Sequence, residues 1–581
     1  MHLFGLSRII NMATAQVPVL PLLATRGSLG IKLLQGKNAF QEIHDLYNDE
    51  STSSKIMRFS DDGACFAFVN GRELKVLSMD TGEVIYSLDK QKTTDIVISP
   101  KNTYIATWEP FFTTPQNPQG FNNYEIHNIK TKCVKKSMIH KNRNTWAPVW
   151  SKDEKICGRC VNNEVQFYED GEFQKAARKL YLQGVSGCAI APCLSPYMIA
   201  VYIMGKKGSP SSVRLFQYPN LGDGQAITNR SFFKADKVDM IWNKKGNALL
   251  ILVSAEVDTT GSSYYGEQTL HLMTTNGNSN IVQFEKKGPI YSVDWNPNSS
   301  QFCVVYGFMP AKATLFNLKS ESVFDFGTGP RNICKYNQHG NILCLAGFGN
   351  LPGIMEMWNV DGKKLIGKPQ ARDTTFFQWC TDGQHLVTAT CAPRLRVSNG
   401  YKIWHYSGKV IHSFDVPKNT ELWETIWQTV PDGTFPVPRI VASVATQEVK
   451  KEAYRPPSAR GTAVKKIVIH ENELPENQRN QENMSAAALK NKKKREAKAK
   501  SKKEIEAASS SNSANASLSD VVTTGDPEKD KKIKNLRKKL KQIEDLKAKQ
   551  SEGRILEKNQ LDKLTTEKDL LKELKDLQIS S

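Results

Sequence analysis

The stretch Trp242-Asn243-Lys244-Lys245-Gly246 is one copy of a turn that recurs along most of this 581-residue chain. Each copy follows an apolar run and holds an aromatic or apolar residue, a polar pair and often glycine, as in Trp295-Asn296-Pro297-Asn298. The copies begin at positions 59, 98, 150, 190, 242, 295, 336, 379 and 427, so neighbouring copies are 39 to 53 residues apart. A period of this length indicates a repeated supersecondary unit.

Strand-like segments fill the space between the turns. The apolar segment Leu249–Val253 follows the turn at Trp242, and alternating segments such as Thr314–Asn317 follow later in a repeat. Four short strands in about 40 to 50 residues are typical of a β-propeller blade, and Asn, Asp, Pro and Gly favour the tight turn between the first two. The sequence therefore predicts an all-β, nine-bladed, WD-repeat-like β-propeller, although its repeats lack the Gly-His and Trp-Asp dipeptides of WD repeats.

The ninth repeat has too little sequence after Gly433 to supply four strands. We expect the segment Val17–Leu34 to complete the last blade, because this closure would hide two sheet edges. The predicted propeller spans residues 17–440 and follows a disordered extension over 1–16. The first 41 residues contain no Asp or Glu, which also fits a mitochondrial transit peptide. We favour an alternative upstream start, with Met12 as the usual initiator.

Composition changes sharply near residue 440. Every Trp and Cys lies before that point, and Tyr454 is the single aromatic residue after it, while residues 441–581 carry half of the net charge of +20. A segment with so many charged residues and so few aromatic residues cannot bury enough apolar surface to form a core of its own. We predict a disordered linker over 441–525, with a basic helix-prone part over 485–508.

A helical region is predicted over 526–579. Asp526-Pro527-Glu528 combines an N-cap acceptor, a proline at the first helical position and acids at the positive end of the helix dipole. Leucine and isoleucine then recur at three- and four-residue spacing, interrupted at Gly553. The pattern favours a helical hairpin or two consecutive partner-binding helices.

Basic side chains gather in two nearly single-signed runs of this tail. They are Lys492, Lys493, Lys494 and Arg495 in the first run, and Lys531, Lys532, Lys534, Arg537, Lys538, Lys539 and Lys541 in the second. A helix stabilised by ion pairs would alternate its charges, whereas single-signed runs are typical of tails that bind nucleic acid. We predict contact with RNA or the ribosome; an acidic protein partner, or a role in solubility or nuclear import, is the alternative.

One segment of the predicted propeller has a similar composition. Between Ala392 and Lys402, the basic residues Arg394, Arg396 and Lys402 are interleaved with Tyr401. Such a loop could touch phosphate and stack on a base. An ordinary connection between two blades is an equally good interpretation.

Motifs for catalysis or for cofactors are not found in the sequence. It contains no G-x-x-x-x-G-K-[ST] loop, no H-E-x-x-H and no G-x-S-x-G. The pair Cys157 and Cys160 lacks the second close pair of a zinc site, and the scattered cysteines are typical of buried residues in a reducing compartment. No apolar run reaches the roughly 18 residues of a membrane span. We therefore predict no enzyme, cofactor, nucleotide, metal or membrane.

Several long strings resemble the eukaryotic translation initiation factor 2A family. They are Lys234–Val238 with Trp242–Lys245, Ser263–His271, Tyr306–Thr314, Phe326–Asn332, Leu345–Leu351 and Ala392–Tyr406. The resemblance runs from about Leu20 to the carboxyl end, and residues 1–11 depart from it. A weaker resemblance links Asp526–Leu540 to the ribosome-binding end of the protein called partner of Y14 and Mago.

The family resemblance implies a cytoplasmic, nine-bladed propeller protein that binds the small ribosomal subunit. It implies delivery of methionyl initiator tRNA without GTP and dependent on the codon, on a subset of mRNAs or at unusual start codons. The missing P-loop fits a carrier that needs no GTP. Two other classes stay open: a propeller scaffold in mRNA regulation or stress signalling, and a propeller enzyme with an unrecognised central site.

Overall fold

The computed structural model describes residues 20–440, apart from 207–208, 223–225, 234 and 256–265, together with Ile543. The chain divides into two compact units, Met1–Ala463 and Val464–Ser581. Beyond residue 440 the structure describes Ile543 alone, which is helical and buried. The extension over 1–16, the linker and the tail helices therefore remain predictions, since they lie outside the described residues.

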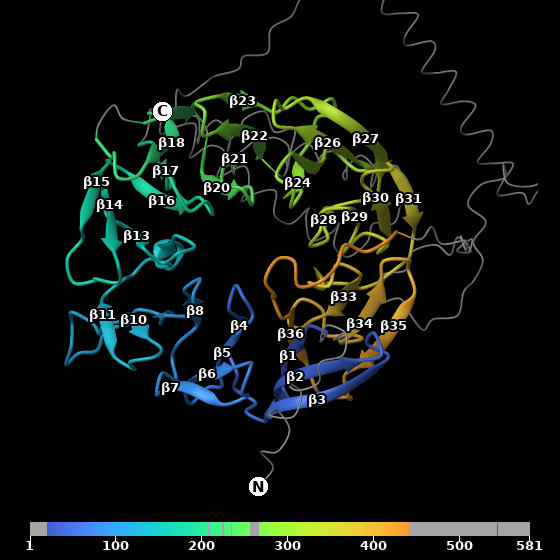
Figure 1. Cartoon of the computed structure of the whole chain (residues 1–581), viewed down its shortest axis with the longest axis horizontal. Coiled ribbons are helices and arrows are strands. Elements are labelled where there is room, and N and C mark those ends of the chain that lie inside the picture. Colours follow the sequence, from blue (N-terminus) through green and yellow to red (C-terminus); the bar gives the residue numbers. More distant parts are fainter. Residues whose placement is uncertain are drawn as a thin grey trace, which may run out of the picture. The chain divides into compact units, whose positions relative to one another are not determined.

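The described part of the first unit contains nine four-stranded antiparallel sheets, so the predicted nine-bladed propeller is confirmed. The sheets are arranged in a ring (Figure 1). Blades one to three contain β4 (Ile56–Phe59), β5 (Cys65–Val69), β6 (Leu74–Ser78), β7 (Val84–Leu88); β8 (Asp95–Ile98), β9 (Tyr104–Trp108), β10 (Tyr124–Asn128), β11 (Val134–Met138); and β12 (Val149–Trp150), β13 (Ile156–Val161), β14 (Glu164–Glu169), β15 (Arg178–Tyr181). Blades four to six contain β16 (Val185–Ile190), β17 (Met198–Ile203), β18 (Ser211–Gln217), β19 (Thr228–Phe232); β20 (Lys237–Trp242), β21 (Ala248–Ala255), β22 (Glu267–Thr274), β23 (Ser279–Ile281); and β24 (Ile290–Trp295), β25 (Gln301–Tyr306), β26 (Ala311–Asn317), β27 (Ser322–Gly329).

Blades seven and eight follow the same order. They contain β28 (Ile333–Tyr336), β29 (Ile342–Ala346), β30 (Met355–Asn359), β31 (Lys364–Gly367); and β32 (Phe376–Trp379), β33 (His385–Thr390), β34 (Gly400–His405), β35 (Val410–Asp415). A 3₁₀ turn, η1 (Arg143–Thr145), lies between blades two and three. The first strand of a blade lies toward the centre of the ring and the fourth lies at the rim, as β4 and β7 show in Figure 1.

Blade nine joins the two ends of the propeller. Its strand order is β36 (Leu422–Trp427), β1 (Leu23–Gly27), β2 (Gly30–Lys37) and β3 (Glu42–Asp49). Because Leu23 pairs with Trp427, the predicted closure by the amino-terminal segment is confirmed. The sequence prediction stopped at Leu34 and missed β3, an outer strand whose charged side chains are largely exposed.

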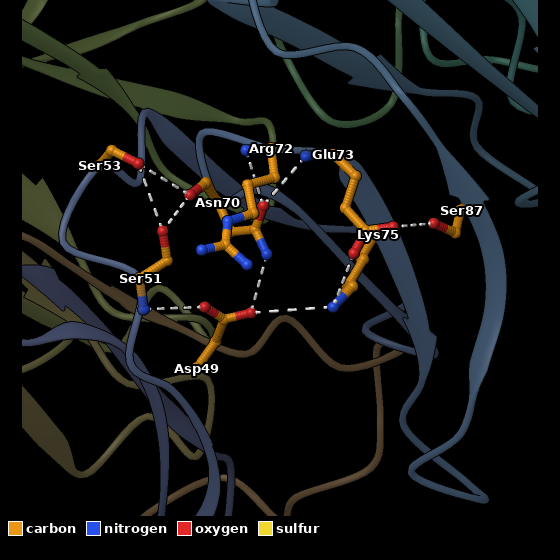
Figure 2. A network of polar contacts seen from close by, with 8 residues as sticks. All are labelled: Asp49, Ser51, Ser53, Asn70, Arg72, Glu73, Lys75 and Ser87. Carbon is orange, nitrogen blue, oxygen red and sulfur yellow. Dashed lines mark hydrogen bonds and ion pairs between the residues drawn. The ribbon is translucent and has the colours of Figure 1, made fainter.

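Polar side chains fasten the closing blade to blade one (Figure 2). The buried Asn70 accepts hydrogen bonds from the backbone N–H groups of Arg72 (3.1 Å) and Glu73 (3.0 Å), and its amide nitrogen donates to Asp49 Oδ2 (3.0 Å). The hydroxyl of Ser53 donates to the carbonyl oxygen of Asn70 (3.2 Å). These bonds join the carboxyl end of β3, in blade nine, to the loop between β5 and β6, in blade one.

The recurring turn also joins neighbouring blades, which explains its residue types. The indole N–H of its tryptophan donates to the blade before it: Trp242 to Ala189 (3.4 Å), Trp295 to Ile241 (2.9 Å) and Trp379 to Lys335 (3.0 Å). The amide of its asparagine donates to the blade after it: Asn243 to Ser299 (3.3 Å), Asn296 to Gly340 (3.0 Å) and Asn337 to Gly383 (2.9 Å). The turn often ends at a positive φ, such as 69° at Gly246, which glycine adopts without strain.

Antiparallel order gives the propeller two different faces. The turns between first and second strands and between third and fourth strands lie on one side, which we call the anchor-turn face. The loops between second and third strands, and the connections between blades, lie on the other, which we call the loop face. Packing between blades forms the core: the ring of Phe302 stacks on that of Phe316 at 5.5 Å, and both join Leu250 and Leu272 of the preceding blade.

Candidate nucleic-acid interface

The predicted RNA-contacting segment of the propeller comprises the loop between β33 and β34, on the loop face of blade eight, and the first residues of β34, with Tyr401 and Lys402. It lies within one blade, so the alternative of a connection between two blades is wrong. Arg394, Arg396 and Lys402 are exposed. The Arg396 guanidinium forms an ion pair with Glu421 (Nε to Oε1, 3.3 Å). The loop is ordered by Asn399, whose amide donates to the carbonyl of Leu395 (2.6 Å). Three cations are therefore accessible there, one of them already paired.

Tyr401 does not lie with these cations. It is in β34 with 4% of its surface exposed, and its ring packs against Phe414 (5.3 Å between centroids) and His412 (6.0 Å). Burial raises the pKa of its hydroxyl well above the ordinary value. In the described fold a base cannot stack on this ring, so Tyr401 drops out of the candidate contact. Composition could not separate the two residues, because they are neighbours in the chain. The strand places Tyr401 on a buried face of the sheet and Lys402 on the opposite, exposed face.

The eleven basic residues of the two tail runs lie outside the described residues. They are Lys492, Lys493, Lys494, Arg495, Lys531, Lys532, Lys534, Arg537, Lys538, Lys539 and Lys541. Their role as an RNA or ribosome contact stays a prediction.

Two of the family-like strings have structural roles. The Arg331 guanidinium donates to the carbonyls of Phe326 (3.1 Å) and Gly327 (3.0 Å) and pairs with the buried Glu356 (2.5 Å). Asn332 exchanges hydrogen bonds with the backbone of Phe348 (both 3.0 Å). These contacts connect blades six and seven.

The pair Cys157 and Cys160 is divided between two interiors of the propeller. Cys157 packs with Trp108 and Tyr124, whereas Cys160 packs with Val165 among others. Positions three apart on a strand point to opposite faces. In the described residues, no group of three or more His, Cys, Asp or Glu side chains is placed as metal ligands would be. None of the described helices is long and apolar enough to cross a membrane.

A cavity of about 540 Å³ lies on the anchor-turn face. Its lining residues come from turns of several blades and from the segment after β36: Asp61, Lys152, Lys244, Asn296, Gln338 and Asp432 are among them. Burial and the neighbouring Asp62 raise the pKa of Asp61. Burial also acts to raise the pKa of Asp432, but the Lys244 ammonium outweighs it and lowers that pKa. Mixed charges of this kind do not favour a polyanion.

Residues 428–440, which we call the closing strap, run along this face. Gln428 donates to the carbonyl of Gly63 in blade one (2.9 Å). Asp432 accepts from Lys244 of blade five (2.6 Å) and from Gln338 of blade seven (2.9 Å). The strap therefore links blades that are far apart in the sequence, a role that sequence reasoning missed.

A second basic and aromatic group, also missed, lies on the loop face of blade two. The loop between β9 and β10 exposes Phe112 and Phe121, with Lys92 and Lys141 beside it. Its sequence signal is the pair Phe111-Phe112 inside a stretch rich in Pro, Asn and Gly. The loop lies outside the recurring turns, so the repeat period of the sequence does not indicate it.

Comparison with known proteins adds to this geometry. Residues 230–425 match the family model described as eukaryotic translation initiation factor eIF2A. The chain is 36% identical to a eukaryotic translation initiation factor 2A of Drosophila melanogaster, over 98% of this chain and all of the relative. It is 34% identical to one of Dictyostelium discoideum, over 93% of this chain and 90% of the relative.

A solved structure shows the same architecture. The crystal structure described as that of the eukaryotic initiation factor matches with a TM-score of 0.64 and 29% identity. The match covers 71% of this chain and 99% of that one.

Proposed function

This chain belongs to the eukaryotic translation initiation factor 2A family, and on that premise we propose that it binds the small ribosomal subunit and directs methionyl initiator tRNA to it without GTP, dependent on the codon. It is a translation initiation factor, and the family is not enzymatic. The proposal extends to action in the cytoplasm, on a subset of mRNAs or at unusual start codons.

The observation that carries the proposal is the length of the similarity. At 36% identity it covers 98% of this chain and the whole relative, so both the propeller and the tail are shared. The accessible Arg394, Arg396 and Lys402 support an RNA contact on the loop face. The two basic runs of the tail support a second, because each Lys or Arg can neutralise a phosphate.

Binding of initiator tRNA to small subunits tests the proposal directly. Purified full-length protein is added to small subunits with an AUG-containing message, and retention of methionyl initiator tRNA is compared with that of elongator methionyl tRNA. We expect retention of the initiator alone, unchanged by omission of GTP and abolished when AUG is replaced by a codon unrelated to it. Equal retention of both tRNAs would contradict the proposal and favour the scaffold alternative.

The tail's share can be separated by its dependence on salt. Replacement of Lys534, Arg537, Lys538 and Lys541 by Gln keeps helix propensity nearly constant. We expect weaker binding to the small subunit and a slope of log K against log salt that flattens by up to about four units. As a matched control, Leu536→Ala with Leu540→Ala should lower affinity with the slope retained. An unaltered slope in the Gln variant would remove these residues from the interface.

A further inference from the structure

We propose that the loop face of blades two and three carries a platform for unpaired bases of single-stranded RNA, formed by Phe112 and Phe121 and flanked by Lys92 and Lys141. The choice of RNA rests on the proposed function. The site itself is new, since neither the basic tail nor the loop of blade eight includes it. Three observations carry the proposal. The two rings are exposed, hydrogen bonds order the loop that bears them, and the two lysines form no ion pair with described residues.

The two rings are exposed together rather than singly. Phe112 is 38% and Phe121 46% exposed, and their centroids are 5.3 Å apart with 32° between the ring planes. Exposed apolar surface that is not scattered but paired marks an interaction site more often than a single exposed side chain does. Base stacking on aromatic side chains is tolerant of sequence, because every base has a π-face.

The loop that carries the rings is held in one conformation. The amide of Asn123 donates to the carbonyls of Glu109 (2.7 Å) and His140 (2.9 Å), which closes the loop at its base. At its tip, the amide of Asn117 donates to the carbonyl of Gly120 (2.8 Å). Gly120 has a φ of 84° and lies so close to Phe111 that a Cβ would be 2.4 Å from its ring. Rings presented by an ordered loop lose little conformational entropy on binding.

Lysines flank the rings without carboxylate partners. The ammonium of Lys92 lies 4.0 Å from the centroid of Phe112, and that of Lys141 lies 4.7 Å from the centroid of Phe111. Within the part of the chain that the structure describes, neither lysine forms an ion pair. Arg143 lies nearby but is paired with Asp95 (3.0 Å). Two exposed cations without carboxylate partners, beside a pair of exposed rings, match the phosphates and bases of a single strand.

An RNA strand fits these observations better than a protein partner. A protein docking on two phenylalanines would need an apolar anchor and acids for both lysines, and nothing on this surface selects such a pair. A folded duplex would not offer base faces to the rings. Each nucleotide of a single strand supplies both a base face and a phosphate, so one ligand satisfies rings and lysines together.

The experiment uses the full-length protein and an oligouridylate of about twelve nucleotides, a length within the range of single-strand sites. Affinity is measured at high salt, where the tail's phosphate contacts are weakened and stacking persists. We expect Phe112→Ala with Phe121→Ala to lower affinity at least about tenfold. Lys92→Gln with Lys141→Gln should flatten the slope of log K against log salt by up to about 1.4 units.

Phe308→Ala is the matched control, because Phe308 is 45% exposed on the loop face of blade six and should leave affinity unchanged. Cross-linking of the same oligonucleotide, substituted with 4-thiouridine, should map to residues 111–121. Wild-type affinity in the double alanine variant, with no cross-link in that loop, would overturn the inference. So would a variant that loses small-subunit binding but keeps its affinity for the oligonucleotide, because the surface would then contact ribosomal protein.

The platform and the proposed function can fail separately. Loss of initiator tRNA selectivity in the retention assay, with cross-links still at the platform, would contradict the proposed function and leave the platform supported. Intact selectivity without those cross-links would overturn the platform alone.

Discussion

The anchor-turn face and the loop face are built from the ends of the same strands, yet they use their side chains differently. On the anchor-turn face, Asn296 and its counterparts are buried and bonded to the next blade, and the closing strap covers part of the surface. On the loop face, paired phenylalanines and unpaired lysines stand exposed. Blades are therefore joined at every recurring turn of the anchor-turn face. On the loop face the described joints are local, such as those of Asn70 and Arg331, and other side chains stay exposed for partners.

The distribution of exposed apolar side chains supports this division. Outside the outermost strands, the described loop face exposes Leu29, Phe112, Phe121, Ile139, Met204, Phe233, Phe308, Met309 and Val397. The described anchor-turn face exposes Leu194 and Val437. Substitution of the paired phenylalanines on the loop face should therefore affect binding, and substitution of the buried asparagines or the closing strap on the anchor-turn face should affect stability.

Removal of the closing strap should have the largest effect on stability. A chain ending at Trp427 loses the buried Phe435 and the bonds to blades one, five and seven, and we expect a loss of about 3 kcal/mol in the free energy of unfolding. A chain ending at Ile440 is the control and should unfold cooperatively like the full protein. Urea unfolding followed by tryptophan fluorescence measures both, since every Trp lies before residue 440. Equal stability of the two chains would show that the strap does not contribute.

Asn296→Ala should have the next largest effect. The change leaves the carbonyl of Gly340 and the backbone N–H of Asn298 without their partners in a buried turn, which costs about 1–3 kcal/mol. Asn298→Ala in the same turn is the control, because Asn298 is exposed and should change stability by no more than about 0.5 kcal/mol. Similar losses for both variants would contradict the assignment of the inter-blade bond.

Mild acid should weaken the anchor-turn face moderately. Burial and the nearby His385 lower the pKa of His405 from 6.5 to about 4. Below pH 6.5 the His405 side chain takes up a proton in the unfolded chain but stays neutral in the folded chain. The free energy of unfolding therefore falls as the pH falls from 6.5 toward 4. Allowing for solvent screening, we expect His405 to contribute about 1 kcal/mol to the loss between pH 7 and pH 5. His271, whose pKa burial also lowers to about 4, adds to the loss in the same direction. His405→Gln should flatten this part of the pH profile, measured by urea unfolding, and an unchanged profile would rule out His405 as its source.

Substitution of the platform should have the smallest effect on stability. Phe112→Ala with Phe121→Ala removes half-exposed rings, so the free energy of unfolding should change by no more than about 1 kcal/mol. The same urea titration measures it. A loss above about 2 kcal/mol would mean that the rings serve the fold, and would remove the contrast between the two faces.

Much of the fold follows from local patterns. The turn at Trp242 repeats with the period of a blade, and the missing strands of the ninth repeat predict closure from the amino terminus. The residues of the candidate RNA contact are predicted less well from the sequence. Composition singled out Arg394, Arg396 and Lys402, which are exposed, but also Tyr401, which is buried. Side chains alternate between the two faces of β34, so the neighbours Tyr401 and Lys402 lie in different environments although composition groups them together.

Local spacing and composition are enough to predict the nine-fold repeat, the closure of the ring and the charged tail. Which side chains meet depends on how the strands are arranged in space. Lys244 and Asp432 are far apart in the chain and come together on the anchor-turn face. Lys92 meets Phe112 only because the connection between blades one and two lies beside the loop between β9 and β10. Contacts of this kind depend on the three-dimensional path of the strands, which carries no period that a sequence displays.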